Sequence, residues 1–148
     1  MSPIRLKINE SEDFKDIEII INCPEVDENL SPLIHQINQM MISIRGKKDG
    51  ITYPLVSDHL LYIESVNDTT FLYTDEDVYE SDKKLYEFEE QLKDTRFMRI
   101  SKNYIVNMSK IESVKALMNG RFEAYLSNGE KVIVNRHYVK SFRKHFLG

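Results

Sequence analysis

The stretch that decides the fold is residues 97–107, which read FMRISKNYIVN. Apolar side chains recur on both sides of the polar triplet Ser101-Lys102-Asn103, and the flanking runs are rich in residues that favour strands. The pattern predicts two short strands, Met98–Ile100 and Tyr104–Val106, joined by a tight polar connection. Because a short connection brings neighbouring strands together in opposite directions, this stretch indicates an antiparallel sheet.

The same pattern extends on either side of this stretch. Downstream, Arg121–Leu126 and Glu130–Val134 flank Asn128-Gly129, and Asn-Gly between two strand-like runs is among the strongest local signals for a hairpin. Upstream, further short strands are predicted at Ile51–Leu55, Leu60–Glu64 and Thr70–Thr74. The chain from residue 45 to residue 148 is therefore predicted to be one mainly β domain (α+β) built from small antiparallel sheets with short helices.

Two helices are expected within this domain. One opens at Ser81 and places three apolar residues on one face: Leu85, Phe88 and Leu92. The other spans Asn135–Phe146, with Val139, Phe142 and Phe146 on one face and Lys140, Arg143 and Lys144 outside. The acidic run Asp75–Asp82 lacks the glycine and the terminal Glu of a calcium loop, and we interpret it as a solvated turn.

Residues 1–44 are predicted to form a separate strand-strand-helix element. Ile4–Ile8 alternates apolar and polar side chains as a half-buried strand does, and Ile17–Asn22 is a short apolar run. Apolar residues then recur at helical spacing over 30–44, with Ser31-Pro32 as a start signal. The apolar helix face needs a partner, which is either the rest of the chain or a second copy.

Composition excludes several classes of protein. The single cysteine, Cys23, cannot form an intramolecular disulfide, and no apolar run approaches the roughly 18 residues of a membrane span. The first residues lack the apolar stretch of a signal peptide, so we expect a cytoplasmic protein without direct membrane insertion. No His, Cys or carboxylate spacing fits a metal site, and no glycine-rich phosphate loop is present. No metal, cofactor, catalytic residue or enzymatic activity is expected.

Charge is distributed unevenly along the chain. The formal net charge is −4, which taken alone argues against an anionic partner. Residues 1–42 carry 3 basic and 8 acidic residues, and residues 43–94 carry 6 basic and 13 acidic residues. Residues 95–148, in contrast, carry 11 basic and 3 acidic residues, a balance of +8. This asymmetry indicates an anionic partner for the last third of the chain.

Three motifs in this order resemble the LytTR DNA-binding domain of bacterial LytR/AlgR/AgrA-type transcription regulators. They are Ile63-Glu64-Ser65, the stretch 97–107 continuing to Ile111–Val114, and the segment 129–139, which reads GEKVIVNRHYV. The resemblance covers about residues 45–146. It implies an elongated fold whose inter-strand loops, and not a recognition helix, enter successive major grooves of double-stranded DNA at promoter direct repeats.

The resemblance also implies which residues face the DNA. Three loops carry them: the turn around Asn67 and Thr70, the triplet Ser101-Lys102-Asn103, and Arg136-His137. Arg136 can pair with both hydrogen-bonding acceptors of guanine, whereas short polar side chains and Lys140 suit phosphates. Arg99 is a further candidate contact, although it could instead form an ion pair with Glu64 or Glu112. Asn135-Arg136 could also simply cap the last helix.

Two points about partners stay open at this level. About 45 residues precede the resemblance, too few for the receiver domain of a response regulator, and they resemble the N-terminus of stand-alone LytTR regulators. This element is expected to pack on its own chain, to form a homodimer, or to bind a membrane-protein inhibitor encoded nearby. The alternative function is a protein-interaction module that uses the basic C-terminal face to bind an acidic protein.

Overall fold

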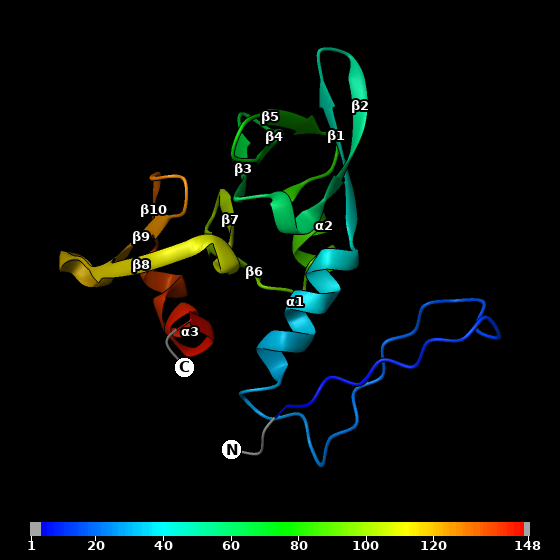
Figure 1. Cartoon of the computed structure of the whole chain (residues 1–148). Coiled ribbons are helices and arrows are strands. Elements are labelled where there is room, and N and C mark those ends of the chain that lie inside the picture. The colour runs from blue at the N-terminus through cyan, green and yellow to red at the C-terminus, as the bar shows by residue number, and fades with distance from the viewer. Residues whose placement is uncertain (1–3, 147–148) are drawn as a thin grey trace.

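The structure is a computed structural model of the chain and describes residues 4–146. Its helices and strands, in chain order, are α1 (Ser31–Met41), β1 (Ser43–Lys48), β2 (Ile51–Val56), β3 (Tyr62–Val66), β4 (Thr69–Tyr73), β5 (Val78–Ser81), α2 (Leu85–Gln91), β6 (Phe97–Ser101), β7 (Tyr104–Asn107), β8 (Ile111–Ala116), β9 (Phe122–Leu126), β10 (Lys131–Val134) and α3 (Arg136–Phe146). Short 3-10 turns follow β2, β7 and β8. The prediction of a mainly β protein with short helices is confirmed (Figure 1).

The strands form two antiparallel sheets. Seven of them lie in the order β2-β1-β5-β4-β3-β7-β6, and the other three lie in the order β10-β9-β8. The strands predicted around Ile51, Ile63, Leu72, Arg99 and Ile105 are all present, as is the hairpin at Asn128-Gly129. Short connections account for the antiparallel pairing of consecutive strands, whereas β1–β5 and β3–β7 are antiparallel pairs of strands that are distant in the chain.

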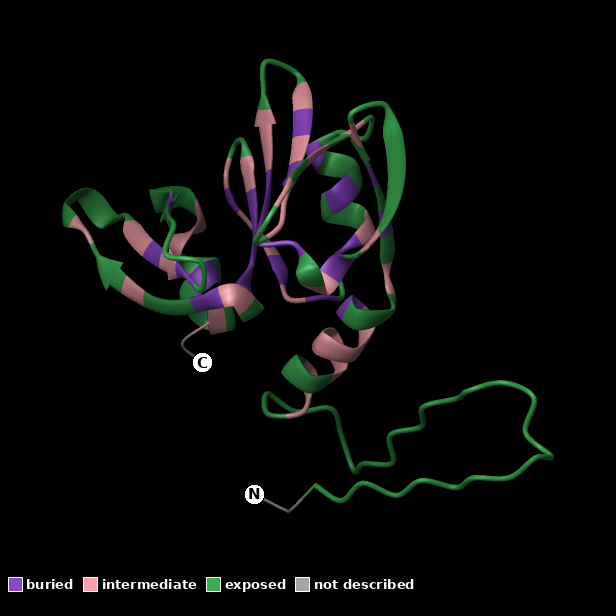
Figure 2. Cartoon of the chain, turned by 45° about the horizontal axis from the view of Figure 1, so that its top comes forward, coloured by how far each residue is buried: buried purple, intermediate pink, exposed green. Residues whose placement is uncertain are grey.

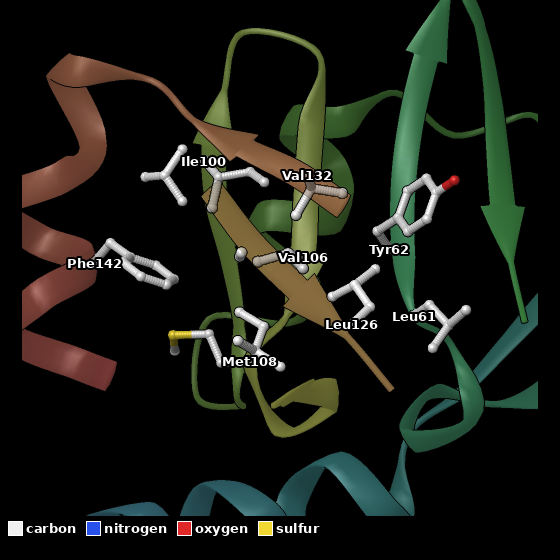
Figure 3. Close-up of a cluster of buried hydrophobic side chains, with 11 residues drawn as sticks. Leu61, Tyr62, Ile100, Val106, Met108, Leu126, Val132 and Phe142 are labelled. Carbon is white, nitrogen blue, oxygen red and sulfur yellow. The ribbon is translucent and has the colours of Figure 1, made fainter. Parts of the chain in front are cut away.

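One hydrophobic core lies between the two sheets (Figure 3). From the seven-stranded sheet it receives Tyr62, Ile100 and Val106, with Leu61 just before β3, and from the three-stranded sheet Ala124, Leu126, Val132 and Val134. Phe142 of α3 is fully buried against them, with Val139 and Phe146 partly buried beside it. The predicted apolar face of the C-terminal helix is therefore confirmed, and it holds α3 on the junction of the sheets.

A second core lies under α2. Leu85, Phe88 and Leu92 are buried against strand residues that include Ile63, Leu72 and Ile105. The predicted helix face is confirmed, but α2 begins at Leu85 and not at Ser81. Ser81 belongs to β5, where it pairs with Thr70 of β4. Residues 78–81 of the acidic run 75–82 form strand β5, so the run as a whole is not a solvated turn.

Helix α1 packs on the domain through one buried polar side chain. Gln39 has no exposed surface, and its Nε2 donates hydrogen bonds to Asp58 Oδ1 (2.8 Å) and Asn107 Oδ1 (2.9 Å). Its Oε1 accepts a hydrogen bond from the backbone N–H of Arg96 (2.8 Å). The helix ends at Met41, and Ile44 belongs to β1. Packing on the rest of the chain is thus the arrangement that this helix adopts here.

The two strands predicted before α1 are absent, which corrects that part of the expected strand-strand-helix element. Residues 4–30 contain no helix or strand, and nearly all are exposed (Figure 2). Within 4–26 the backbone closes one turn, where the Phe14 N–H donates to the Ser11 carbonyl (3.3 Å). The sequence has the period of strands, but a strand also needs a hydrogen-bonding neighbour, which this segment lacks in a single copy. No helix in the described part of the chain is long and apolar enough to cross a bilayer.

Candidate nucleic-acid interface

Three connections lie beside one another and together form the candidate interface. They are the β3–β4 turn, the β6–β7 turn and the start of α3. The Ser65 N–H at the end of β3 donates to the carbonyl of Asn103 in the β6–β7 turn (2.9 Å). The Asn135 N–H, just before α3, donates to the carbonyl of Ile100 in β6 (2.8 Å). Main-chain hydrogen bonds therefore fix the three connections relative to one another.

The β3–β4 turn presents Asn67 to solvent. Asn67 and Asp68 have φ angles of 49° and 64°, and Val66 pairs with Thr69 across them. Two successive positive φ angles make a type I′ turn, which suits Asn and Asp and matches the twist of a hairpin. Lys84, at the start of α2, donates from Nζ to the Asp68 carbonyl (3.0 Å). Lys84 therefore adds a cation beside this turn that the sequence did not single out.

Thr70 does not lie on this surface. Its side chain is 1% exposed, and its backbone pairs with Ser65 of β3 and Ser81 of β5. The expectation that Thr70 faces DNA is therefore corrected by its burial. The reason is the alternation of a strand: the residue that follows the half-buried Thr69 points to the opposite face of the sheet, toward the core.

Arg99 holds the β6–β7 turn from within the protein. Its Nη1 forms an ion pair with Glu89 Oε1 of α2 (3.0 Å), and its Nε donates to the Ser101 carbonyl (2.9 Å). Its Nη2 donates to the Lys102 carbonyl. The ion-pair partner is Glu89 and not Glu64 or Glu112, which had been the sequence-based alternatives. Arg99 therefore orients the turn, and its guanidinium is already occupied.

The β6–β7 turn itself presents two side chains. Lys102 and Asn103 are exposed, whereas Ser101 is half-buried and its Oγ accepts a hydrogen bond from the Asn103 N–H (3.3 Å). A register shift between Arg99 and Ser101 marks a bulge at this edge of the sheet. Bulges re-aim side chains at strand ends, and here the irregularity directs the turn outward.

The start of α3 presents Arg136 and His137. Asn135 caps the helix, because its Oδ1 accepts a hydrogen bond from the His137 N–H (3.2 Å). The capping role is thus carried by Asn135, and Arg136 remains exposed. A methyl group added at Gly120 would come within 3.3 Å of Arg136 Cγ and Cδ. The stem of Arg136 therefore lies against the Gly120 backbone, which supports the guanidinium at the surface.

The outward face of α3 continues the positive charge. Arg136 and Lys140 are four residues apart and share one helical face. The guanidinium carbon of Arg143 lies 5.8 Å from the centroid of the Phe122 ring. Within residues 4–146 the side-chain ion pairs involve Lys47, Lys48, Lys93 and Arg99. Lys102, Arg136 and Lys140 thus have no contact ion pair within that range and remain available to an anion.

A stacked pair of tyrosines, Tyr62 and Tyr73, lies where the two sheets meet, and Tyr62 links the sheets. The Tyr62 hydroxyl of β3 donates to Glu130 Oε2 in the β9–β10 connection (2.7 Å), and the Tyr73 hydroxyl donates to Glu64 Oε1 (3.0 Å). The two rings stack with their centroids 4.3 Å apart. Burial and the hydrogen bond to Glu64 raise the pKa of Tyr73 to about 12. Sequence reasoning missed this junction, because the pairing of Tyr62 with Glu130 joins residues far apart in the chain.

The described residues contain no group of three or more His, Cys, Asp or Glu that could hold a metal ion. The surface presents hydrogen-bond donors and cations on the three connections, whose relative positions are fixed by main-chain hydrogen bonds.

Comparison with known proteins identifies a family for most of the chain. The family model of the LytTr DNA-binding domain matches residues 51–147. The chain is also similar to a solved structure described as the LytTr DNA-binding domain of a putative methyl-accepting/DNA response regulator from Bacillus cereus. That match has a TM-score of 0.67 and 27% identity, and covers 72% of this chain and 96% of the other.

Relatives in sequence include regulatory proteins of Enterococcus faecalis and Staphylococcus aureus. The chain is 32% identical over 91 residues to the sensory transduction protein LytT of Enterococcus faecalis, and 30% identical over 95 residues to the transcriptional regulatory protein LytR of Staphylococcus aureus. The matches cover 61% and 64% of this chain but only 38% and 39% of those relatives. An uncharacterized HTH-type transcriptional regulator of S. aureus matches over 94% of this chain and 92% of its own length, at 27% identity.

Proposed function

The chain belongs to the LytTr DNA-binding domain family, and from this premise we propose that it is a sequence-specific transcription regulator acting on double-stranded promoter DNA in the cytoplasm. The observation that carries the proposal is the fixed arrangement of three exposed connections, whose cations Lys102 and Arg136 form no contact ion pair within residues 4–146. Phosphate attraction provides most of the affinity, and side chains at base edges provide specificity.

Each connection has a distinct role in this proposal. Arg136 enters a major groove and binds guanine with two hydrogen bonds, with His137 beside it. The β6–β7 turn enters the successive groove with Lys102 and Asn103, while Ser101 and Arg99 hold that turn in place. Asn67 contacts the DNA from the β3–β4 turn, and Lys140 contacts a phosphate. Thr70 is left out because it is buried.

The decisive experiment measures binding to the gene's own upstream region and to random duplex DNA of equal length. Arg136→Ala is expected to cost about 1–3 kcal/mol on the specific site and to reduce discrimination. Lys140→Ala should weaken binding to both duplexes alike, because it removes a phosphate contact. Arg45→Ala is a matched control, since Arg45 is exposed on β1, outside the three connections. If six to ten phosphates are neutralised, affinity should fall about 10³–10⁵-fold between 50 and 200 mM salt.

The same measurements can reject the proposal. Equal affinity for the upstream region and for random duplex would contradict sequence-specific regulation. Binding of an acidic protein that Arg136→Ala and Lys140→Ala both abolish, without any DNA preference, would favour the protein-interaction module instead. Equal losses for Arg45→Ala and Arg136→Ala would place the DNA elsewhere on the molecule.

Protein partners form the second part of the proposal. Paired direct repeats in a promoter would be occupied by two protomers, and a homodimer would favour such double occupancy. A membrane-protein inhibitor encoded nearby is the other proposed partner. Support for a protein partner comes from residues 4–26, whose large apolar side chains are exposed in the single chain. Co-expression with a neighbouring multi-pass membrane protein should reduce promoter binding if that inhibitor exists.

A further inference from the structure

Residues 4–26 expose far more apolar surface than the rest of the chain does over a similar length. The large apolar residues in this segment are exposed by 38–98%. They are Ile4, Leu6, Ile8, Phe14, Ile17, Ile19, Ile20, Ile21 and Val26. Monomeric proteins rarely leave this many large apolar side chains of one short segment uncovered, which indicates that the segment contacts a partner.

This segment doubles back on itself, as Figure 1 shows for the blue trace. The reversal is the turn at Ser11–Phe14, where the Asp13 N–H also donates to Ser11 Oγ (3.2 Å). Residues 4–9 and 16–21 therefore run in opposite directions on the two sides of a turn. That is the chain path of a β-hairpin without its ladder of hydrogen bonds.

One register of such a hairpin sorts the side chains cleanly. If residue 4 pairs with 21, 6 with 19 and 8 with 17, six aliphatic residues share one face: Ile4, Leu6, Ile8, Ile17, Ile19 and Ile21. On the other face Lys7 lies opposite Glu18, a favourable cross-strand pair. A shift by one residue in either direction would place Glu18 opposite Leu6 or Ile8. The sequence thus specifies the register strongly.

We propose that residues 4–21 form a β-hairpin arm, and that its aliphatic face docks on the same face of a second copy of this chain. An isolated two-stranded hairpin is marginally stable in water, which accounts for the absence of strands in the single chain. A face made of six aliphatic side chains, with the opposed pair Glu10 and Lys15 only at its turn end, is complementary to itself. The arm is thus a dimerisation element that orders on association.

The surface area that two docked arms would bury is sufficient for a weak dimer. Six aliphatic side chains that each lose roughly 100 Å² bury about 1,200 Å² over two copies. That is the lower end of the range for specific protein interfaces, which agrees with a dissociation constant on the order of micromolar. Exposed Met40 and Met41 of α1 lie further along the chain and are not needed for this estimate.

The charges of the arm distinguish a second copy from the basic surface of α3 as the docking partner. Glu10, Glu12, Asp13 and Asp16 lie in the turn or beside it, and Glu18 lies on the face opposite the aliphatic one. In the dimer these like charges repel weakly, so added salt should leave association unchanged or strengthen it. Docking of the acidic arm on the basic face of α3 would instead weaken with salt.

The experiment is analytical ultracentrifugation of the full chain without DNA, so its result is independent of the proposed regulatory function. Ile19→Glu puts a charge on the aliphatic face, and the matched control Ile20→Glu puts the same charge on the opposite face, across from Arg5. We expect the wild type and Ile20→Glu to dimerise at micromolar concentration and Ile19→Glu to stay monomeric. Dimerisation of the wild type should persist at high salt.

Three outcomes would overturn the proposal. The first is that the wild type stays monomeric up to about 100 μM, roughly a hundred times the expected dissociation constant. The second is that Ile19→Glu and Ile20→Glu change dimerisation equally, and the third is that high salt abolishes dimerisation. The register has its own check in Lys7→Cys with Glu18→Cys, in a Cys23→Ser background. Directly opposed residues are close enough for a disulfide, so oxidation should link the two positions within one chain and preserve the dimer. Failure to link them would refute this hairpin.

Discussion

Replacing Gln39 by methionine tests whether α1 is part of the DNA-binding domain or a separable segment. Methionine has a similar length and volume, so the substitution removes hydrogen bonds without opening a large cavity. Gln39 is fully buried, and its side chain makes hydrogen bonds to Asp58 (2.8 Å), Asn107 (2.9 Å) and the Arg96 N–H (2.8 Å). All three partners belong to the region after α1.

The expected magnitude follows from what each partner loses. The Asp58 carboxylate keeps the hydrogen bond from Gln36 (2.7 Å), and Asn107 Oδ1 keeps those from Ser109. The Arg96 N–H, in contrast, loses the acceptor shown for it. With about 0.5–1.5 kcal/mol for each neutral hydrogen bond and more for the one to a carboxylate, we expect a loss of about 2–4 kcal/mol. For a domain of this size that lowers the Tm by roughly 8–16 °C.

Urea unfolding followed by circular dichroism measures this loss, and Gln36→Met is the matched control. Gln36 lies one turn earlier on α1 and donates to the same Asp58 oxygen, but it is only half-buried. We expect Gln36→Met to cost no more than about 1.5 kcal/mol. If Gln39→Met cost no more than Gln36→Met, or if α1 melted in a separate earlier transition, the integration of α1 into the domain would be refuted.

Three further predictions concern the sheets and the turn that Arg99 holds. Gly46→Ala should lower the free energy of unfolding by about 1–3 kcal/mol, because the new methyl group would lie 2.7 Å from Tyr79 Cβ and 2.8 Å from Leu55 Cδ1. The control is Lys47→Ala at the exposed next position, which should change the free energy of unfolding by less than about 0.5 kcal/mol. Burial and the hydrogen bond to Glu64 raise the pKa of Tyr73 from 10.0 to about 12, so its contribution to stability is complete below pH 10 and is lost as pH rises through 12. The pKa values of Tyr62, Tyr104 and Tyr125 are raised as well, so tyrosinate absorbance should show several delayed ionisations, of which Tyr73→Phe removes one. Glu89→Gln should reduce DNA affinity a few-fold, because it releases Arg99, and should cost at most about 1 kcal/mol of stability. The control is Glu90→Gln, which breaks only the exposed pair with Lys93 and should leave DNA affinity unchanged.

The sequence was sufficient for the parts of the fold whose local pattern and burial agree. The strands around Thr70–Thr74 and Tyr104–Val106, and the face of α3 with Phe142, were predictable because the residues that favour each element are also those that the cores bury. The hairpin at Asn128-Gly129 was predictable because Gly129 supplies the positive φ (90°) that the turn requires.

The misses have a common physical reason, which is dependence on a distant partner. β5 lies within the acidic run 75–82 and has two exposed positions, and it becomes a strand because β4 offers a hydrogen-bonding edge. Residues 4–9 and 17–22 have strong strand periods and remain without strands, because no edge is offered to them. Strand formation is a property of a pair, so one segment's composition could not decide either case.

The candidate site shows the same dependence at the level of single side chains. Arg99 and Lys102 are three residues apart in one motif, and both are long cations suited to DNA. Only the structure separates their roles: Arg99 is bound to Glu89 and to two carbonyls of the turn, whereas Lys102 has no contact ion pair within residues 4–146.

An arginine that already satisfies a carboxylate would have to break that pair to reach a phosphate, and the exchange gains little because both partners are anions. A cation in a DNA-binding motif therefore acts on DNA directly only when the protein leaves its charge unpaired. By this criterion we propose Arg136, Lys102 and Lys140 as direct DNA contacts, and Arg99 as the residue that fixes the turn from which Lys102 extends.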